Sequence, residues 1–499
     1  MFLAFDPGYL LAASIFRGAV SRDDRHSDLR AYVSLFMGLA FTPTVGYAGL
    51  LLATLMLGAC ATYTPQALDG ADVNAVLAVP DRAALARQAT HLLHPRLAPL
   101  ALDFTRPLDA GEIGVIAVLA NPDLRSLRAQ QQLADAQVFA AGLLPDPQLS
   151  LGFDNVLAPS GQGLSSAFTG GMTLDLLGAL ATRRVERQVA GAAAEQVRLD
   201  VAWQEWTVAG QAQLLAIRLP RQRLAAQLSR TAAIAADAGL RRTLRVAARG
   251  DLKGDEVEAR RIAAADANAR ALLAEREADT TRLELNRLLG MSPAEPLALA
   301  LPPALPAWVP PDPAALFDAA RSARLDLQAF AAGYNSQQAT LHRAVLGQYP
   351  RLAITLTGAR DTSKVKTFGP AVTLDVPLWN RNRGAIATAE ADRERLRSEY
   401  SARLHQTRAD IAALVAALKR DEGSRTALAT QLPDIERFAA SLEFAAARGD
   451  VTLPLAESAR ADAVDKRLAL LALEQACAEQ RLALALAVGS SLSESKLTP

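Results

Sequence analysis

The chain has 499 residues, of which 51% are hydrophobic and only 5% aromatic, and its formal net charge is +1. Its length would accommodate about three ordinary domains, but Ala, Leu, Arg, Glu and Gln dominate the long middle stretches, a bias typical of long helices packed on one another. The balanced charge, without a block of Lys or Arg, argues against nucleic-acid binding.

The amino-terminal region, residues 1–59, leads to a candidate lipidation site at Cys60. An uncharged run, Val45 to Ala59, precedes this cysteine and ends in small residues. The pattern resembles a bacterial lipoprotein signal, and this resemblance implies cleavage before Cys60 and attachment of acyl chains such as palmitate. Because Ala61 and not an acidic residue follows, the analogy also implies sorting to the outer membrane. The run is too short for a comfortable membrane span.

The first 36 residues do not suit a signal peptide, because Asp23, Asp24 and Asp28 lie among their arginines. We therefore expect translation to start at Met37. An internal hydrophobic helix that ends in an ordinary cysteine is the alternative interpretation of this region. The other cysteine, Cys477, lies in a helical pattern and is expected to pack as a small core residue.

Residues 60–110 are interrupted by prolines and are expected to form an irregular arm along the body of the protein. His91 and His94 lie three residues apart in this arm. With Pro95 next and no third ligand nearby, a surface or packing role is favoured over metal binding.

Beyond the arm, four landmarks recur in the same order. The spacing is 203 for the first two (326 − 123 and 350 − 147), 200 for the third (373 − 173) and 199 for the fourth (448 − 249). We interpret them as a duplicated unit, with copies at 111–291 and 314–489, a proline-rich linker at 292–313 and a tail at 490–499. The landmarks are Asp123-Leu124, Pro147 to Leu151, Thr173-Leu174-Asp175 and Arg249-Gly250-Asp251, which return as Asp326-Leu327, Pro350 to Ile354, Thr373-Leu374-Asp375 and Arg448-Gly449-Asp450.

In the first copy we expect a helix over 110–144, in which Pro122 marks either a break or the true helix start near Asn121. Apolar and polar residues then alternate over 148–154 and 168–176, which predicts a β-hairpin at 148–176 with one apolar face. A helix over 179–248, containing Pro220, a turn, and a return helix over 252–289 follow. In the turn, Asp251 is placed to cap the return helix.

The second copy has the same order of elements. We expect a helix over 316–346, a hairpin at 351–376, a long helix over 385–447 containing Pro433, and a return helix to residue 488. Each long helix would extend on the order of 100 Å. The predicted fold class is thus mainly α with a small β part, in two tandem repeats.

Four amphipathic strands cannot close a barrel by themselves, and an open sheet with an apolar outer face needs partners. The strands are near the length that tilted strands need to cross a membrane. Three copies of four strands would give a twelve-stranded barrel.

The chain resembles the TolC-like outer-membrane efflux proteins. The resemblance rests on Asn121-Pro-Asp-Leu124, Ala141 to Pro147 and Thr373 to Leu378, while Asn380-Arg-Asn-Arg-Gly384 is similar to the CzcC- and CusC-type heavy-metal channels. It implies a homotrimer with a β-barrel in the outer membrane and a helical tunnel in the periplasm. It also implies a periplasmic adaptor and an inner-membrane pump as partners, small solutes (among them heavy-metal cations) as substrates, and neither a cofactor nor enzymatic activity.

The resemblance implies functional positions at the two helical turns, residues 249–253 and 448–452, which would dock the adaptor and close the pore. An acidic pair that narrows the entrance of several relatives falls here on Leu455 and Ser458, with Glu457 close by. Asp255 and Glu256 are candidate substitutes, although a solvated helix face explains them equally well. The residues named for the turns are Arg249, Gly250, Asp251, Leu252, Arg448, Gly449, Asp450, Val451 and Thr452.

Asp175 and Asp375 are the notable charges of the hairpins, and they either line the channel wall or cap the following helices. Two other functions stay open. One is the exit duct of a drug-efflux or type I secretion system. The other is a soluble coiled-coil scaffold.

Overall fold

The structure, a computed structural model, describes residues 63–65, 73–74, 77–155, 166–250, 252, 254–301 and 303–490, without the side chains of 176–179 and 181. The chain divides into two units, Met1–Val76 and Leu77–Pro499. All named helices and strands belong to the second unit. The predicted lipidation site at Cys60 and the predicted start at Met37 lie outside the described residues.

The strands form one antiparallel sheet with the order β1-β2-β3-β4. β2 pairs with β3, so the sheet joins the two halves of the sequence, with Met172 opposite Leu356. The β part of the fold is therefore a single sheet and not two separate hairpins. The strands are β1 (Gln148–Asn155), β2 (Ser166–Leu174), β3 (Arg351–Arg360) and β4 (Lys366–Asp375).

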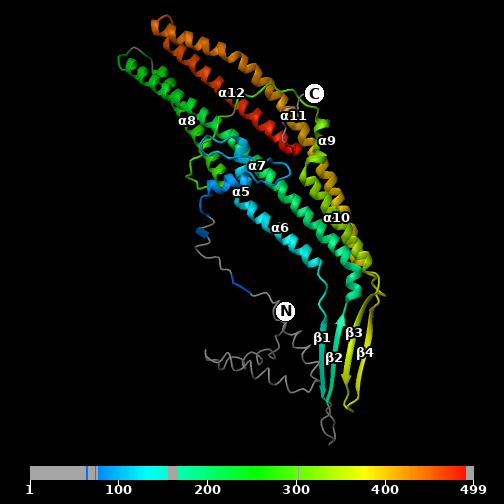
Figure 1. Cartoon of the computed structure of the whole chain (residues 1–499). Helices are drawn as coiled ribbons and strands as arrows, with labels where there is room; N and C mark the ends of the chain where they lie inside the picture. The colour runs from blue at the N-terminus through cyan, green and yellow to red at the C-terminus, as the bar shows by residue number, and fades with distance from the viewer. Residues whose placement is uncertain are drawn as a thin grey trace, which may run out of the picture. The chain divides into compact units, whose positions relative to one another are not determined.

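Two helical hairpins extend from one end of the sheet (Figure 1). The first consists of α7 (Leu176–Ala247) and α8 (Gly254–Leu288), the second of α11 (Arg383–Arg448) and α12 (Leu453–Val488). At 72 residues, α7 is on the order of 100 Å long. It continues through Pro220, and α11 through Pro433. A proline removes one backbone hydrogen bond, and here the leucine before each proline is buried in the packing.

The shorter helices pack against the long ones (Figure 1). The helix expected over 110–144 is divided at Asn121. The side chain of Asn121 accepts a hydrogen bond from the backbone N–H of Leu124. The second part ends at Ala141, three residues before the predicted end, because the chain turns at Gly142. The short helices are α4 (Arg82–Ala89), α5 (Ala110–Ala120), α6 (Pro122–Ala141), α9 (Pro313–Ala323) and α10 (Leu325–Leu346).

The helix expected over 316–346 is interrupted at Arg324, and this prediction was wrong. Arg324 is extended, with φ −71° and ψ 121°, and no proline marks the break. Its guanidinium instead binds Asp326 and the carbonyl of Ala487. A contact with a residue 163 positions away thus ends one helix and starts the next.

The predicted first hairpin also extended too far. The second strand ends at Leu174, and Leu176 is the first residue of α7. In the second half β4 ends at Asp375 and α11 begins only at Arg383, after Arg381 and Asn382, which both have positive φ. Pro377 disfavours a helical conformation at Val376, whereas the corresponding residue of the first half, Leu177, permits it.

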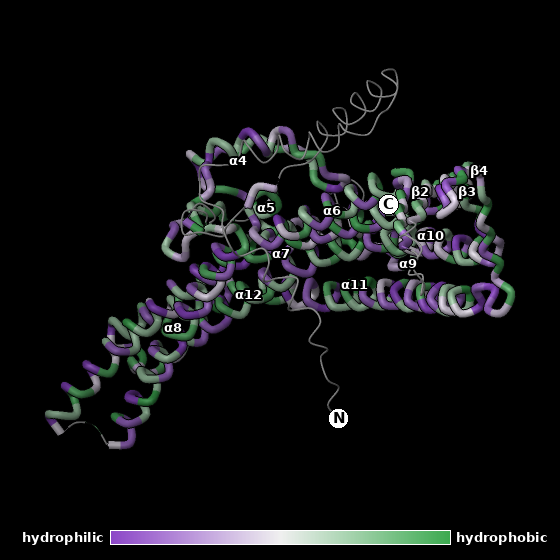
Figure 2. The backbone as a smooth tube through the Cα atoms, turned by 90° about the horizontal axis from the view of Figure 1, so that it is seen from below, coloured by the Kyte–Doolittle hydropathy of each residue, from purple (hydrophilic) through white to green (hydrophobic). Residues whose placement is uncertain are grey.

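The largest buried cluster joins the arm, α5, α7 and the end of α8, with Ile113, Ile116, Leu219, Leu285 and Leu289 fully buried. A second cluster joins α9, α11 and α12. Toward the turns the buried residues are alanines, such as Ala233 and Ala271, and hydrophilic and hydrophobic residues alternate along the helices (Figure 2). Small side chains let the helices approach closely with only a narrow apolar seam.

Among the described residues, no helix combines the length and apolar character needed to cross a bilayer.

Candidate functional site

One face of the sheet is apolar and exposed. Leu149, Leu151 and Phe153 of β1 are 72%, 67% and 64% exposed. Directly paired residues share a face, and the register places apolar residues opposite them and across the sheet. The set continues with Phe168, Met172, Leu174, Leu352, Ile354, Leu356, Phe368, Val372 and Leu374 and ends in Arg360 and Lys366 at the second hairpin turn. No described residue covers this face, and an exposed apolar patch of this size is unusual in a protein.

The opposite face is polar and rich in threonine. Thr173 lies opposite Thr355, and their hydroxyls are 3.1 Å apart. The hydroxyl of Ser150 donates to the carbonyl of Gly171 at 3.2 Å. The predicted alternation of both hairpins is therefore confirmed at the level of register, and the sheet separates an apolar surface from a water-compatible one.

Asp175 and Asp375 occupy different places where the strands meet the helices. Asp175 is the residue before α7, but its side chain makes no capping hydrogen bond. Asp375 is the last residue of β4 and pairs with Arg351. Both are exposed. Neither carboxylate therefore caps the helix that follows it, which contradicts one of the two roles left open by the sequence.

The turn between α11 and α12 is closed by Gly449. This glycine has φ 81°, and the backbone N–H of Asp450 donates to the carbonyl of Ala445 at 3.0 Å. Such a contact after a left-handed glycine satisfies the last carbonyls of a helix. Arg448 pairs with Asp450 at 3.0 Å and lies over the ring of Phe444. Thr452 is the N-cap residue of α12, but its side chain makes no capping hydrogen bond.

The turn between α7 and α8 also contains a glycine with positive φ, Gly250, at 83°. An added Cβ would meet nothing within 4 Å at either glycine, so backbone conformation and not space requires the glycine. Arg249 and Leu252 lie beside it, while Asp251 lies outside the described residues. The return helix starts at Gly254 and not at 252.

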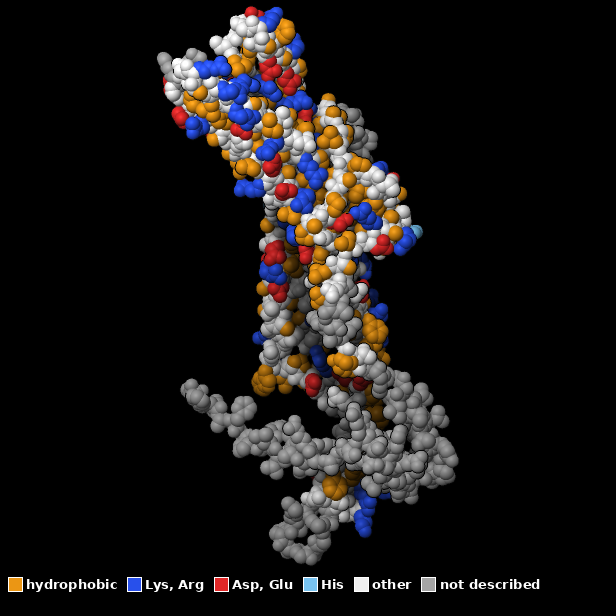
Figure 3. All heavy atoms as spheres, turned by 90° about the vertical axis from the view of Figure 1, so that its left-hand side faces the viewer, with side chains coloured by type: hydrophobic (Ala, Val, Ile, Leu, Met, Phe, Trp, Pro, Cys, Tyr) orange, Lys and Arg blue, Asp and Glu red, His pale blue; other side chains and the backbone are white. Residues whose placement is uncertain are grey.

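Asp255 and Glu256 are exposed in the first turn of α8. The backbone N–H of Glu256 donates to the Asp255 carboxylate at 3.1 Å, and no ion pair is recorded for either within the described chain. Negative charge is favourable at a helix start. Charged side chains gather over this end of the helices (Figure 3).

Glu457 lies between the two helical hairpins. Its carboxylate is 2.5 Å from Arg242 of α7 and 2.9 Å from Arg260 of α8. It therefore joins α12 to both helices of the first hairpin near the turns. The sequence singled out this residue as a possible constriction, and its arginine partners could not be predicted because they lie about two hundred positions earlier.

A buried ionic cluster joins the start of α10 to α11 and to the end of α12, and sequence analysis missed it. Asp326, 4% exposed, binds Arg324 of the preceding break at 2.7 Å and Arg403 of α11 at 3.0 Å. Arg324 also lies over the ring of Trp203 at 4.7 Å. The only sequence signal was the recurring Asp-Leu pair, which gave no hint of the two arginines.

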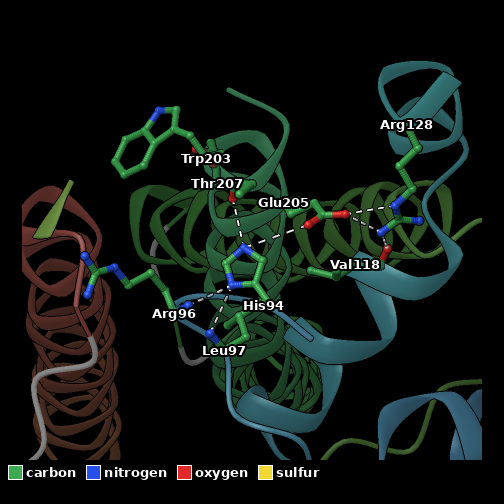
Figure 4. Close-up of polar contacts among 9 residues, drawn as sticks. His94, Arg96, Leu97, Val118, Arg128, Trp203, Glu205 and Thr207 are labelled. Carbon is green, nitrogen blue, oxygen red and sulfur yellow. Dashed lines mark hydrogen bonds and ion pairs between the residues drawn. The ribbon is translucent and has the colours of Figure 1, made fainter. Parts of the chain in front are cut away.

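His94 fixes the arm to α7. Its Nδ1 accepts from the backbone N–H groups of Arg96 and Leu97, each at 3.0 Å, and Nε2 lies 2.9 Å from the carbonyl of Ala202 (Figure 4). Glu205 lies 3.9 Å from the same nitrogen and is held by Arg128. Both ring nitrogens are engaged, so His94 has the packing role that the sequence favoured.

Residues 316–490 match the model of a protein family described as outer membrane efflux protein. No curated protein matches the chain. The chain is similar in fold to several solved structures, three of which are CusC, CmeC and MtrE. CusC is 15% identical, with a TM-score of 0.62 over 83% of this chain and 99% of that one. The CmeC outer membrane channel of Campylobacter jejuni is 14% identical, with a TM-score of 0.66 over 88% and 96%.

The third is the open state of the MtrE outer membrane channel of Neisseria gonorrhoeae, which is 17% identical, with a TM-score of 0.61 over 87% of this chain and 99% of that one. At these identities the structures report the fold, while the family model reports sequence kinship in the second half. Residues 316–490 therefore belong to the outer membrane efflux protein family, and the chain as a whole has the fold of outer-membrane channels.

Proposed function

We propose that three copies of this chain form an outer-membrane exit channel for small solutes. One observation carries the proposal: an exposed apolar sheet face backed by a polar face, in a sheet with two unpaired edges, β1 and β4. Edge strands with free backbone groups pair with other chains. In lipid, only a closed barrel satisfies the backbone hydrogen-bonding groups of every strand. Three copies of four strands would close a barrel of twelve strands.

Strand length supports a membrane position for this sheet. The strands have 8, 9, 10 and 10 residues, and a tilted membrane strand needs about 9–11. The threonine-rich face would line a water-filled lumen. Asp175 and Asp375 would then contribute two carboxylates from each copy to the neck between barrel and helical tunnel.

We propose that the helical turns at Gly250 and Gly449 form the periplasmic tip. There they would dock an adaptor protein that connects the channel to an inner-membrane pump. The support is the matched left-handed glycine at both turns and the charged surface around them (Figure 3). Asp255 and Glu256 would present carboxylates to solutes at the entrance, which favours cations, while Glu457 would hold the two hairpins together.

Two substrate classes fit this channel, heavy-metal cations and organic drugs. The motif Asn380 to Gly384 favours metals by its likeness to CusC-type channels. The solved structures of similar fold divide between CusC and channels of other names at nearly equal identity. We therefore propose small solutes as the cargo, with the pump and adaptor deciding among them. An exposed apolar sheet is a liability in a soluble coiled-coil scaffold, and this argues against that function.

The experiment replaces one residue on each face of β1. Leu151→Arg puts a charge on the apolar face, at a cost of about 2–4 kcal/mol if that face meets lipid. The neighbouring Ser150→Arg puts the same charge on the polar face. Cell fractionation and mass measurement of the detergent-extracted protein should find wild type and Ser150→Arg as outer-membrane trimers, and Leu151→Arg depleted there. Equal membrane insertion of both variants, or a monomeric wild type, would contradict the proposal.

We further propose that Cys60 anchors the amino terminus through acyl chains, on the basis of the lipoprotein-like run before it. Labelled palmitate should enter wild type and not Cys60→Ala. Label retained in Cys60→Ala would overturn the anchor without affecting the channel.

A further inference from the structure

A cavity of about 990 Å³ lies among the arm, α5, α7, the 303–309 linker and α12. Its size is at the upper end of the roughly 300–1,000 Å³ typical of small-molecule sites. Most of its wall is apolar, with Leu97, Val115, Ile217, Leu305 and Leu482 among the lining residues. It lies away from the sheet and from the helical turns.

Positive charges outnumber negative charges on the wall of this cavity, which we call the arginine cavity. Arg96, Arg221 and Arg481 line it, and Asp109 is its one acidic residue. Asp109 is engaged in capping α5 through the backbone N–H of Glu112, at 2.8 Å. Arg481 is already paired with Glu422. Two guanidinium groups, those of Arg96 and Arg221, therefore face the cavity without a carboxylate partner in the described chain.

Arg221 is 6% exposed. Within the described chain its one hydrogen bond runs from Nη1 to the carbonyl of Ile217 at 3.1 Å, so most of its five donors lack an acceptor there. Burial lowers the pKa of this guanidinium, and the charges of Glu474 and Glu479 oppose the shift only in part. A buried cation held this way is costly unless an anion accompanies it.

Other donors in the same wall are also unsatisfied. The indole Nε1 of Trp206 and the Nε of Arg96 are buried with no acceptor among the described residues. The side chain of Arg96 points away from His94, which binds only its backbone (Figure 4). Unpaired buried donors are rare in folded proteins and call for a partner. Here they share a wall with two guanidinium groups that form no ion pair within the described chain.

We propose that the arginine cavity binds an amphiphile with one acyl chain and an anionic head group, carboxylate or phosphate. Guanidinium groups bind both anions through paired hydrogen bonds. Arg96 and Arg221 bind the head group, and the apolar wall formed by the linker and α12 covers the acyl chain. The site is separate from the proposed channel and does not depend on it.

The test measures tryptophan fluorescence in the purified full-length protein, exchanged into amphipol. Trp206 and Trp308 line the cavity, and bromine quenches tryptophan emission at close range. Three probes are titrated: dibromostearate, its neutral methyl ester, and a brominated lysophosphatidic acid. Saturable quenching by the first or the third supports the proposal and distinguishes a fatty acid from a lysophospholipid. Trp206→Phe/Trp308→Phe should lose this quenching, which separates it from quenching of the exposed Trp379.

Arg221→Gln and Arg96→Gln should each raise the half-saturating concentration about ten-fold or more, in keeping with the loss of a charge-assisted hydrogen bond. Arg230→Gln, on an exposed position of the same helix, should not. The methyl ester tests the head group without any substitution. Equal binding of acid and ester, or no saturable quenching by either anionic probe, overturns the proposal. Unchanged quenching together with a loss of trimer in Arg221→Gln also overturns it, since the cavity would then be a contact between copies.

Discussion

Asn121 donates from Nδ2 to the carbonyl oxygen of Leu288 at 2.8 Å and thereby ties the start of α6 to the end of α8. Arg324, 203 positions later (324 − 121), donates to the carbonyl of Ala487 at 2.9 Å, and Ala487 lies 199 positions after Leu288 (487 − 288). A glycine with positive φ follows each return helix, at 290 and 489. The same joint is thus made twice with different side chains, an amide in one half and a guanidinium in the other.

The second joint should be the more sensitive to mutation. Arg324→Met leaves the buried carboxylate of Asp326 with Arg403 alone, and we expect a loss of about 3 kcal/mol in the free energy of unfolding, because an uncompensated buried charge is costly. Denaturant titration in one detergent measures it. Arg321 forms an exposed ion pair on α9, so Arg321→Met should change the free energy of unfolding by less than about 1 kcal/mol. A similar small effect at Arg324 would mean that the cluster does not hold the joint.

The same cluster predicts a pH dependence. Burial alone would raise the pKa of Asp326, but the hydrogen bonds and charges of Arg324 and Arg403 outweigh it and the pKa is lowered. A lowered pKa in the folded state contributes stability above the unfolded value of about 3.9, and this is lost as pH falls through the folded value. Wild type should therefore lose more stability than Asp326→Asn below about pH 4. Parallel stability profiles for the two proteins would contradict this assignment.

Substitution by alanine should change stability in opposite directions at Gly449, in the turn, and at Gly423, inside α11. Gly449→Ala places a side chain at φ 81° and should destabilise by about 1 kcal/mol. Gly423→Ala lies inside the helix with nothing within 4 Å of the new Cβ, so it should stabilise by about 0.5–1 kcal/mol. Thermal unfolding of the two variants in the same detergent decides. Stabilisation by both changes would show that the turn does not require a left-handed residue.

Glu457 should couple the two helical hairpins. Glu457→Gln removes its pairing with Arg242 and Arg260 and should speed amide hydrogen exchange around both turns, by an amount consistent with about 1–2 kcal/mol for two partly exposed pairs. Glu443→Gln is the control, because Glu443 pairs with Arg460 within the second hairpin. If the control loosens the first hairpin as much as Glu457→Gln does, the coupling does not run through Glu457.

Cys477 should be inert. It is fully buried, and burial, assisted by the charge of Glu422, raises the pKa of its thiol to about 11. Thiolate is the reactive form, so native protein at pH 8 should leave Cys477 unlabelled by maleimide until it is unfolded. Rapid labelling of this residue in the native state, located by peptide mass mapping, would contradict the packing seen here.

The sequence by itself determined the features that local chemistry controls. Alternation of period two placed Leu149, Leu151 and Phe153 on one face, and that face is apolar except for Arg360 and Lys366 at the second hairpin turn. Proline 122 marked a helix break, and Gly250 and Gly449 marked the two turns, since a left-handed backbone needs glycine. Each of these signals lies within a few residues of the structure it specifies.

Only the tertiary structure decided the rest. Arg324 breaks a helix because Asp326 and the carbonyl of Ala487 bind its guanidinium, and no neighbouring residue announces it. Glu457 became a bridge because α7 and α8 bring two arginines to it. The arginine cavity arises where the arm, α5, α7, the linker and α12 meet. Such contacts depend on how long helices pack side by side, and packing joins residues whose separation along the chain carries no local signal.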